Sequence, residues 1–472
     1  MKTAILWFRQ DLRLSDHGAI AHAIQHGYQL IPVFIWDPAR EGAWAAGGAT
    51  RWWLHHALAS LNKKISGAEL WIGQGESAEL LKDLVTRTGA EAVFWSRRYE
   101  PEAIVRDTEL KTLIGQWGVE ARSFNNALLF EPQTVSTGQG RPYQVFTPFW
   151  RQVSSGKISR PHRYDQYEVS WLSAPDDGST QLDELALLPN INWDAGFHDR
   201  WEVSEEAAQG ELQRFLDSGI RNYGERRDYP FERGTSRMSP YLHFGMISPR
   251  QVWEAADAVC HDRGISDETY LKEIVWREFA HHILYHFPHT PEAPLRDKYA
   301  DFPWNEDVAS LRAWKRGITG YPIVDAGMRE LWSTGWMHNR VRMIVASFLV
   351  KHLLISWQEG ARWFWDTLVD ADLASNTLGW QWAGGCGADA APYFRIFNPM
   401  TQGAKFDAAG DYVRRWVPEL ANLSTPYIHQ PWEAPASALK DAGVILGETY
   451  PHPIVDHKAS RNRALEALDA IK

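Results

Sequence analysis

The sequence has little cysteine and no long hydrophobic run. Its 472 residues include only two cysteines, Cys260 and Cys386, too few for a disulfide framework or for an iron–sulfur cluster. No apolar run reaches the roughly 18 residues that a membrane-spanning helix needs, so we expect no membrane span. The first residues have one lysine and a short apolar stretch that charge soon follows, which indicates a first β-strand rather than a secretory signal. We therefore expect a protein of the reducing cytoplasm.

The sequence also lacks an excess of positive charge. It has 49 Lys and Arg against 59 Asp and Glu, a formal net charge of −10, which argues mildly against nucleic acid as a partner. That objection holds only for evenly spread charge, and the basic residues here are clustered. Tryptophan, by contrast, is abundant, with 25 residues. We expect most of them in a large aromatic core and a minority in stacking or electron transfer.

The first 128 residues alternate between strand-like and helix-like hydrophobic patterns. Strands are expected at residues 4–8, 30–36, 69–72, 92–95 and 119–124, and helices at residues 16–25, 50–64, 77–88 and 102–117. This alternation predicts a doubly wound parallel α/β sheet, whose ligands lie beyond the carboxyl ends of the strands. The first strand is followed by RQDLR rather than by a glycine fingerprint, so the usual dinucleotide site is absent.

The rest of the chain divides into a connector and a helical region. Residues 129–200 are rich in proline and glycine and have little periodicity, which predicts a long connector over the surface. Later patterns are almost all helical, with helices expected at residues 204–218, 248–262, 267–286, 324–334, 338–352 and 362–369. We therefore predict an α/β domain at 1–128, a connector at 129–200 and an all-α domain at 201–472.

The segment at residues 221–240, RNYGERRDYPFERGTSRMSP, is dense in arginine and small hydroxyls. Its end resembles a helix start, with Ser239 as N-cap and Pro240 at the first helical position. Free backbone N–H groups there, together with the hydroxyls of Thr235 and Ser236, suit a pyrophosphate. The segment is equally consistent with an ordinary capped helix beside a solvated charged run.

A second segment, LKEIVWREFAHH at residues 271–282, places three different side chains on one helical face. Glu273, Trp276 and Arg277 are spaced i, i+3 and i+4. A carboxyl group, an aromatic plane and a guanidinium together suit a nucleic-acid base, on which the aromatic ring can stack. Taken alone, the pattern is better explained by an amphipathic helix with a core tryptophan and an internal ion pair.

Two later segments carry further polar side chains. In WMHNRVRMIVASF, Asn339, Arg342 and Met343 share one helical face and Arg340 points elsewhere, within reach of a phosphate; a core helix with polar caps is the alternative. If the segment DADLASNTLGWQW is helical, Asp372, Asn376 and Trp380 are spaced i, i+4 and i+8. Asp370 and Asp372 lack ligands at metal spacing, so we predict no metal site. The paired histidines are assigned no chemistry: His55 with His56, and His281 with His282.

Taken in order, these segments resemble the photolyase/cryptochrome family over nearly the whole chain. The matching stretches are WFRQDLRLSDH, GTSRMSPYLHFG, WREF, TGYPIVDAGMREL, STGWMHNRVRM and the run from Asp370 to FNPMTQGAKFD. The resemblance implies a bent FAD in the helical domain. It also implies that a lesion is flipped out of DNA and receives an electron from excited, reduced FAD.

The resemblance also implies roles for individual residues. Contacts with FAD are expected from Tyr223, Thr235, Ser236, Arg237, Met238, Ser239, Trp276, Arg342, Asp370, Asp372 and Asn376, the last placing an amide against flavin N5. Electrons are expected to reach the flavin from the surface through Trp304, Trp357 and Trp380. Contacts with the lesion and DNA are expected from Glu273, Trp276, Arg277, Asn339, Arg340, Met343 and Gln402. The predicted catalytic residues are Glu273, Asn339, Met343, Asn376 and the three tryptophans.

Three positions separate repair from signalling within this family. Plant cryptochromes, which parts of this chain resemble, typically have aspartate at the position of Asn376. They usually have other residues at the positions of Trp276 and Met343. We therefore predict a class III photolyase for cyclobutane pyrimidine dimers, with a cryptochrome-type blue-light receptor as the alternative. A (6-4) photolyase would have histidines at the positions that Asn339 and Met343 hold here, which argues against that class. The arginine cluster and Trp276 oppose a flavin electron carrier that binds no DNA.

The family's α/β domain can hold a second, light-harvesting chromophore. The class III resemblance favours methenyltetrahydrofolate over a deazaflavin or a second flavin, and no motif identifies the contacts. The expected partner is DNA that contains pyrimidine dimers, bound by a monomer.

Overall fold

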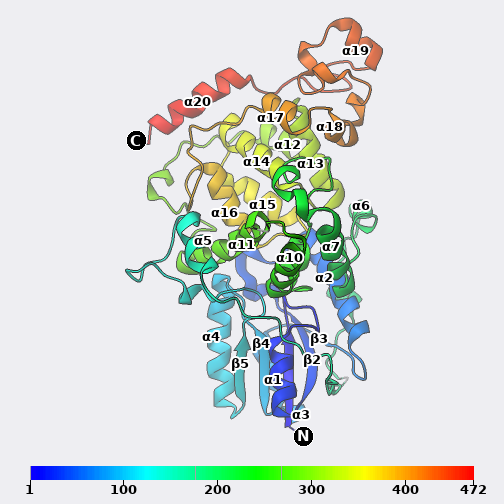
Figure 1. Ribbon diagram of the computed structural model, residues 1–472, viewed down its shortest axis with the longest axis vertical. Helices are drawn as coiled ribbons and strands as arrows, with labels where there is room; N and C mark the ends of the chain where they lie inside the picture. The colour runs from blue at the N-terminus through cyan, green and yellow to red at the C-terminus, as the bar shows by residue number, and fades with distance from the viewer. Residues whose placement is uncertain (1, 176, 267, 472) are drawn as a thin grey trace.

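The computed structural model of the protein describes residues 2–175, 177–266 and 268–471. A parallel sheet of five strands, in the order β3-β2-β1-β4-β5, lies at the lower end of the molecule in Figure 1. The strands are β1 (Lys2–Phe8), β2 (Tyr28–Trp36), β3 (Trp71–Gln74), β4 (Ala92–Ser96) and β5 (Glu120–Phe124). Each lies where the sequence predicted one, and the order reverses at β1. The predicted doubly wound parallel sheet is confirmed.

Helices cover both faces of this sheet because its strands are apolar on both sides. They are α1 (Gly18–His26), α2 (Gly48–Lys64), α3 (Ser77–Thr88) and α4 (Pro101–Gln116). Leu6 of β1 belongs to the core that contains the buried residues of α1 and α2. The adjacent Ile5 and Trp7 belong to the opposite core, with the buried residues of α3 and α4. Side-chain alternation along β1 therefore separates the two layers.

The connector after β5 is mostly irregular, but it makes specific contacts. Leu30 of β2 donates its N–H to Ser170 O over 2.8 Å and accepts from Leu172 N over 2.9 Å, so the connector returns to the sheet. It also contains two α-helices that the sequence did not predict, α5 (Phe146–Ser154) and α6 (Ala195–His198). Phe149 of α5 packs against the later helix α11, which explains why this proline-rich segment can still form a helix.

The remainder of the described chain is helical, which confirms the predicted all-α part. Its helices are α7 (Glu205–Ser218), α8 (Tyr223–Arg226), α9 (Ser239–His243), α10 (Pro249–Arg263), α11 (Glu268–His286), α12 (Val308–Arg316), α13 (Pro322–Thr334), α14 (Asn339–Ser347), α15 (Trp357–Thr367), α16 (Leu373–Gly384), α17 (Pro399–Phe406), α18 (Asp411–Trp416), α19 (Ala436–Ala442) and α20 (His457–Asp469).

Some helix boundaries differ from those predicted. The first residue of the helix expected at 267–286 lies outside the described residues. The helix expected at 338–352 is α14 followed by a π-helical turn at Phe348–His352. The helix expected at 362–369 begins earlier, at Trp357, because the Ser356 side chain caps it by accepting from Gln358 N. Tertiary contacts and local caps decided these ends.

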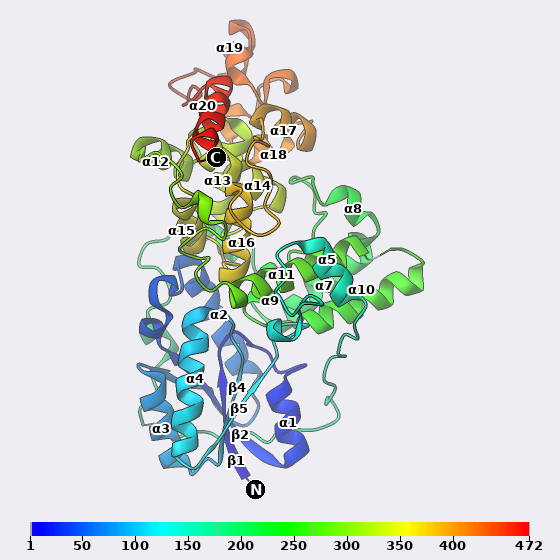
Figure 2. The same ribbon diagram turned by 90° about the vertical axis from the view of Figure 1, so that its left-hand side faces the viewer.

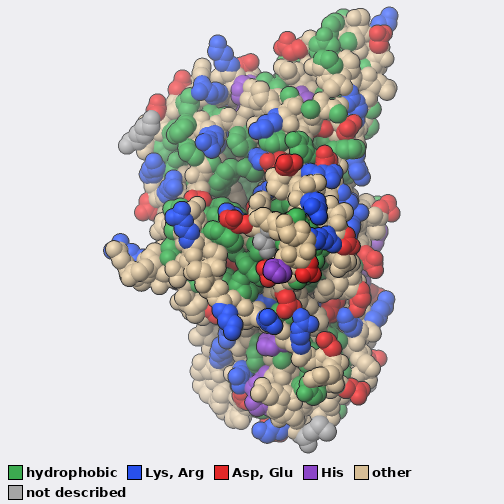
Figure 3. Space-filling view, viewed as in Figure 1, with side chains coloured by type: hydrophobic (Ala, Val, Ile, Leu, Met, Phe, Trp, Pro, Cys, Tyr) green, Lys and Arg blue, Asp and Glu red, His purple; other side chains and the backbone are tan. Residues whose placement is uncertain are grey.

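The helices form two groups, which Figure 2 separates clearly. The lower group, α5 and α7–α11, lies above the sheet in these views, and the buried residues of α7, α9 and α10 share one core with α1 and α2. The upper group, α12–α18 and α20, has a core of its own. Figure 3 shows a hollow in the front face of the helical part, at the height of α14, α15 and α16 in Figure 1.

A buried polar network fastens the sheet domain to the lower helix group. Arg13 is fully buried and donates to Gly245 O over 2.8 Å and to Asn126 O over 3.0 Å. Asp16 Oδ2 lies 3.1 Å from Arg250 Nε. Because both arginines find oxygen partners in the other segment, the two domains are docked in one register.

Candidate functional site

The start of α9 corrects a prediction about the anion site. Ser239 is the first helical residue, and Met238 occupies the N-cap position without a side-chain cap. The predicted roles of Ser239 as N-cap and Pro240 as first helical residue are therefore wrong by one position, because the helix begins one residue earlier. A five-residue helix sums few peptide dipoles, so an anion here depends more on nearby guanidinium groups.

Arg237 is the guanidinium best placed for that task. Its backbone has a φ of 56°, and its Cζ lies 5.3 Å from the ring of Trp336. The buried Nε has no hydrogen-bond partner in the described chain. Burial and the neighbouring Arg200 and Arg233 lower the pKa of Arg237 to about 9. A half-buried cation with an unpartnered Nε, placed among other cations, favours an anionic ligand such as a diphosphate.

Arg342 and Asp370, two of the residues expected to contact FAD, form an ion pair. Arg342 Nη2 lies 2.8 Å from Asp370 Oδ2, and Arg342 Nε donates to Met337 O over 2.8 Å. Asp370 is buried, whereas the Arg342 guanidinium also lies 6.0 Å from the Trp336 ring. Trp336 therefore has Arg237 from the lower helix group and Arg342 from the upper group near its ring.

Asp372 lies between two histidines from the lower helix group. Its carboxylate caps α16 by accepting from Ser375 N over 2.8 Å, and Oδ2 lies 3.4 Å from His281 Nε2 and 3.9 Å from His243 Nδ1. Burial alone would raise the pKa of Asp372, but His281 holds it well below its usual range. The same contact raises the pKa of His281 against the effect of burial. The pair therefore favours carboxylate with imidazolium.

Asn376 and Trp380 lie one turn apart in α16, as predicted. Asn376 Nδ2 donates to Ala361 O over 3.0 Å, so its carbonyl oxygen remains as the group able to accept from an N–H. Trp380 is only 2% exposed and packs against Phe364 with ring centroids 4.9 Å apart. The predicted spacing placed Asp372 inside this helix. In the structure Asp372 is the N-cap, one residue before the first helical residue.

The three tryptophans of the predicted electron path differ in burial. Trp380 and Trp357 are 2% and 3% exposed, and they lie in the packed helices α16 and α15. Trp304 is partly buried and lies 4.3 Å from Phe302, centroid to centroid. Two of the three tryptophans are thus buried and the third reaches the surface, and their electron-transfer role remains a prediction.

The lesion-side residues of α11 have defined partners. Glu273 Oε1 lies 2.6 Å from Arg227 Nη1. Trp276 stacks on Phe146 with centroids 3.7 Å apart and planes 6° apart, and it is half-buried. One ring face of Trp276 is therefore covered by the connector, and the ring is held in a fixed plane from which its other face can stack.

Arg277 is directed elsewhere. Its Nη1 donates to Ala127 O over 2.7 Å and lies 3.6 Å from Glu278 Oε1. The sequence spacing predicted that Arg277 lies on the same helical face as Glu273. Its guanidinium instead binds the backbone just before the connector. The structure thus does not bring Arg277 together with Glu273, and its DNA contact remains a prediction.

The residues expected on α14 lie on the opposite helix group. Arg340 Nη2 is 2.8 Å from Asp228 Oδ1, and its Cζ lies 4.4 Å from the ring of Phe406. Asn339 is exposed and Met343 half-buried, so both have surface available to a ligand. Gln402, in α17, is also half-buried; its DNA contact is not tested by these contacts.

Sequence reasoning missed several residues that organise this site. Arg227 and Asp228 are consecutive, yet they pair with α11 and α14 respectively; only their position in the charged segment pointed to them. Phe146 lies behind Trp276, and no local pattern could have predicted that contact. His281 received no chemistry, although its pairing with Asp372 places it at the site.

A second cavity lies at the carboxyl ends of the strands, between the sheet and the helical part. Its lining includes Trp7 and Arg9 from the end of β1, Arg106 from α4, and His243 and Trp365 from the helical part. The position is the one expected for ligands of a doubly wound sheet. The closed space is about 60 Å³, smaller than an aromatic chromophore, so a large ligand requires movement of side chains at its mouth.

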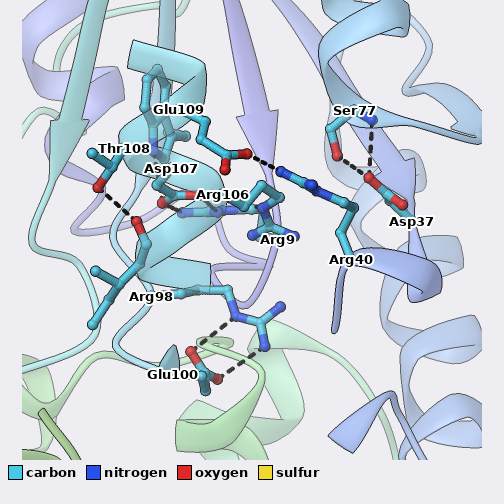
Figure 4. Close-up of polar contacts among 12 residues, drawn as sticks. Arg9, Asp37, Arg40, Ser77, Arg98, Glu100, Arg106, Asp107, Thr108 and Glu109 are labelled. Carbon is cyan, nitrogen blue, oxygen red and sulfur yellow. Dashed lines mark hydrogen bonds and ion pairs between the residues drawn. The ribbon is translucent and has the colours of Figure 1, made fainter. Parts of the chain in front are cut away.

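Arginines and carboxylates alternate around this second cavity, as Figure 4 shows. Arg9 Nη1 lies 2.7 Å from Asp107 Oδ1, and Arg98 Nη2 lies 2.9 Å from Glu100 Oε1. The buried Nη2 of Arg106 has no partner in the described chain. Burial, with Arg9 and Arg98 nearby, lowers the pKa of Arg106 to about 10. Arg106 is therefore the cation of this cavity best placed to meet an anionic group.

The described residues contain neither a membrane-spanning helix nor a cluster of metal-binding side chains. No helix there is long and apolar enough to cross a bilayer. No group of three or more His, Cys, Asp or Glu side chains in the described ranges is arranged to hold a metal ion.

Two family models match this chain. The model described as DNA photolyase matches residues 4–165, and the model described as the FAD binding domain of DNA photolyase matches residues 270–470. The first range contains the sheet, and the second contains α11 and α14–α16, which carry most of the expected site residues.

Known proteins resemble the chain over its whole length. It is 49% identical to a deoxyribodipyrimidine photo-lyase of Agrobacterium fabrum, covering 100% of this chain and 99% of that protein. It is 38% identical to cryptochrome-2 of Arabidopsis thaliana, covering 99% of this chain and 79% of that protein. A crystal structure of a class III photolyase from Agrobacterium tumefaciens superimposes with a TM-score of 0.95 at 48% identity, covering 100% of this chain and 98% of that one.

Proposed function

Since this chain belongs to the DNA photolyase/cryptochrome family, we propose that it is a photolyase that repairs cyclobutane pyrimidine dimers in DNA. Its near relatives in sequence and in structure include photolyases over the full chain length. Asn376, Trp276 and Met343, which favour repair over signalling, are retained. The proposal therefore prefers a repair enzyme to a blue-light receptor.

One observation carries the assignment of the lesion site. The consecutive residues Arg227 and Asp228 pair with Glu273 of α11 and with Arg340 of α14. Two helix groups are thereby joined at one rim, and the half-buried Trp276 and Met343 belong to the same two helices. A flipped-out dimer would enter between these helices, with one pyrimidine on the Trp276 ring.

The cofactor site extends behind that rim. Arg237 would neutralise the FAD diphosphate, beside Thr235 and Ser236, and the Arg342–Asp370 pair would lie against the flavin. When bound, reduced and excited by light, FAD would supply the electron that opens the dimer ring. The protein positions the partners: Asn376 offers a carbonyl oxygen, and Asp372 is held ionised by His281.

Glu273 and Asn339 would bind the lesion by hydrogen bonds. The Glu273 carboxylate accepts from N–H groups, and Arg227 at 2.6 Å holds it in place. Asn339 both donates and accepts through its exposed amide. Together they match the edge of a pyrimidine pair, whose N–H and C=O groups alternate.

The test is light-driven repair by the FAD-loaded, reduced protein. We expect blue light to restore the thymine absorbance of an oligonucleotide that contains one cyclobutane dimer, with no recovery in the dark. Glu273→Ala should slow repair at subsaturating DNA, whereas the exposed Lys440→Ala should not. No recovery at any DNA concentration, together with a light-dependent change in binding to a protein partner, would show a receptor instead.

The cavity of the sheet domain is the proposed antenna site, and methenyltetrahydrofolate is the proposed chromophore. Its carboxylates would meet Arg9 and Arg106, and its ring would lie near Trp7, over which both guanidiniums already stand at 4.7 Å and 5.3 Å. Extraction of the purified protein and an absorbance spectrum would identify the chromophore. A deazaflavin or a second flavin in the extract would contradict the folate assignment.

Partners and location follow from the same proposal. The partner is dimer-containing DNA, which a monomer is expected to bind with an affinity that falls as salt rises. The proposed location is the reducing cytoplasm, since the chain has only two cysteines and both are buried.

A further inference from the structure

A third pocket opens in the upper helix group, apart from the residues assigned to FAD, lesion or antenna. It has a volume of about 680 Å³ and is formed by α12, α13, α15 and α18 with the segment that follows α18. Its walls include Lys315, Arg316, Trp332, Trp363 and Arg415. None of these side chains has a role in the proposed repair reaction.

The aromatic wall is an ordered stack with an exposed end. Trp332 and Trp363 are parallel, with planes 2° apart and centroids 5.9 Å apart. The ring centroid of Trp193 lies 6.0 Å from that of Trp332, with planes 36° apart. Trp332 is nevertheless 46% exposed, which is unusual for so large an apolar side chain. A planar ligand would extend this stack without any need to order the rings first.

The rest of the wall is cationic. Lys315 Nζ lies 5.1 Å from the Trp363 ring and Arg415 Cζ lies 5.3 Å from the Trp416 ring. Within the described chain, no carboxylate pairs with Lys315, Arg316 or Arg415. The positive charge of this wall is therefore available to a ligand, although the chain as a whole carries −10.

One acid beside the pocket is already engaged. Glu419 Oε1 lies 2.8 Å from Arg329 Nη2 at the edge of the pocket. Arg415 also adds to the positive field at Arg200, whose pKa is lowered by burial and by neighbouring arginines. Among the described residues, four cations and no carboxylate line the pocket, an arrangement that attracts anions.

We propose that this pocket binds a nucleoside phosphate, with the base stacked on Trp332 and the phosphates held by Lys315, Arg316 and Arg415. The pocket is large enough for a nucleotide, and it combines the two features that such a ligand requires, an exposed aromatic plane and unpaired cations at its side. A simple anion would not use the tryptophans, and an apolar ligand would not use the cations. The ligand is a free nucleotide or one nucleotide of a single strand.

The experiment titrates FAD-loaded protein with ADP that carries a methylanthraniloyl fluorophore, and then displaces it with unlabelled competitors. ADP and a short oligothymidylate distinguish the two sources, and displacement by either supports the site. Tripolyphosphate and thymidine test charge and base separately, and each should compete at least about tenfold more weakly than ADP. Equal competition by tripolyphosphate, or no saturable binding at millimolar probe, overturns the proposal.

Variants locate the binding. Trp332→Ala should weaken binding about tenfold, Trp332→Phe should retain it, and Arg415→Ala should weaken it with a shallower salt dependence. Lys440→Ala, an exposed lysine of α19, is the matched control, and flavin absorbance checks folding. If Trp332→Ala does not fold, the double variant Lys315→Ala/Arg316→Ala tests the same pocket. Loss of binding in Arg106→Ala, with none in the pocket variants, would place the ligand in the sheet-domain cavity and overturn the proposal.

Discussion

Trp276 shows how a single side chain is prepared for stacking. Phe146 covers one ring face at 3.7 Å, and the planes differ by 6°, so the indole is held in one orientation before any ligand binds. The entropy cost of ordering it has thus been met during folding, and a stacked base gains more from it. Arg227 does the same for Glu273 through an ion pair of 2.6 Å.

We expect Trp276→Ala to lower the affinity for dimer-containing DNA about tenfold, because one base–aromatic stack is lost. Trp276→Phe retains an aromatic ring. Its loss of binding free energy should therefore be less than half of the loss in Trp276→Ala. Equilibrium binding to a lesion duplex measures both variants, with flavin absorbance as the check on cofactor content. An unchanged affinity in Trp276→Ala would mean that the lesion does not stack on this ring.

At the scale of the element, α11 connects the site to the rest of the fold. Its exposed side carries Glu273 and Trp276, whereas its buried Glu278 accepts from Leu129 N over 2.8 Å and from Phe130 N over 3.2 Å. Burial raises the pKa of Glu278 to about 7. The helix therefore carries an acid whose ionisation opposes folding near neutral pH.

The sign of this effect gives a pH prediction. Because the pKa rises from 4.5 unfolded to about 7 folded, the stability linked to Glu278 is present below pH 4.5 and is lost as pH rises to about 7. Glu278→Gln should remove this loss, so the variant should gain up to roughly 3 kcal/mol over the parent at pH 8 and little at pH 5. Urea midpoints across this range measure it, and a difference that is constant with pH would contradict it.

Helices α15 and α16 approach each other closely at Gly360. A Cβ there would meet the Trp380 ring at 2.0 Å, so any larger residue must displace that ring. We expect Gly360→Ala to cost about 1–3 kcal/mol or more and to slow photoreduction of bound FAD by an external donor. The matched control is Gly115→Ala in α4, where a Cβ meets no atom within 4 Å. Unchanged photoreduction in Gly360→Ala would remove Trp380 from the electron path.

At the scale of the whole molecule, the docking of the sheet domain depends on few buried charges. Asp16 accepts from Ser248 Oγ over 2.5 Å and lies 3.1 Å from Arg250. Arg13 lies close to Asp16 and is fully buried. Loss of the Asp16 charge would leave these guanidiniums uncompensated between the domains.

We therefore expect Asp16→Asn to destabilise the protein by about 3–5 kcal/mol and to make the connector more sensitive to limited proteolysis. The control is Glu254→Gln, which breaks the exposed pair with Arg163 and should cost less than about 1 kcal/mol. Thermal unfolding monitored through flavin release and circular dichroism compares the two. Equal effects would mean that the buried network contributes no more than a surface ion pair.

The sequence alone determined the alternation of strands and helices, the all-α second half and the family, because hydrophobic periodicity and ordered motifs are local properties of the chain. It also placed Asn376 and Trp380 one turn apart. The start of α9 was misjudged by one residue, because competing caps differ by little in free energy.

Only the tertiary structure decided which of those residues meet. It joined α11 to α14 through Arg227 and Asp228, and it turned Arg277 toward Ala127. It also set His281 beside Asp372. These contacts link segments far apart in the chain, and their geometry follows from how the helix groups and the sheet pack together. No local pattern contains that information, since packing is a property of the whole folded molecule.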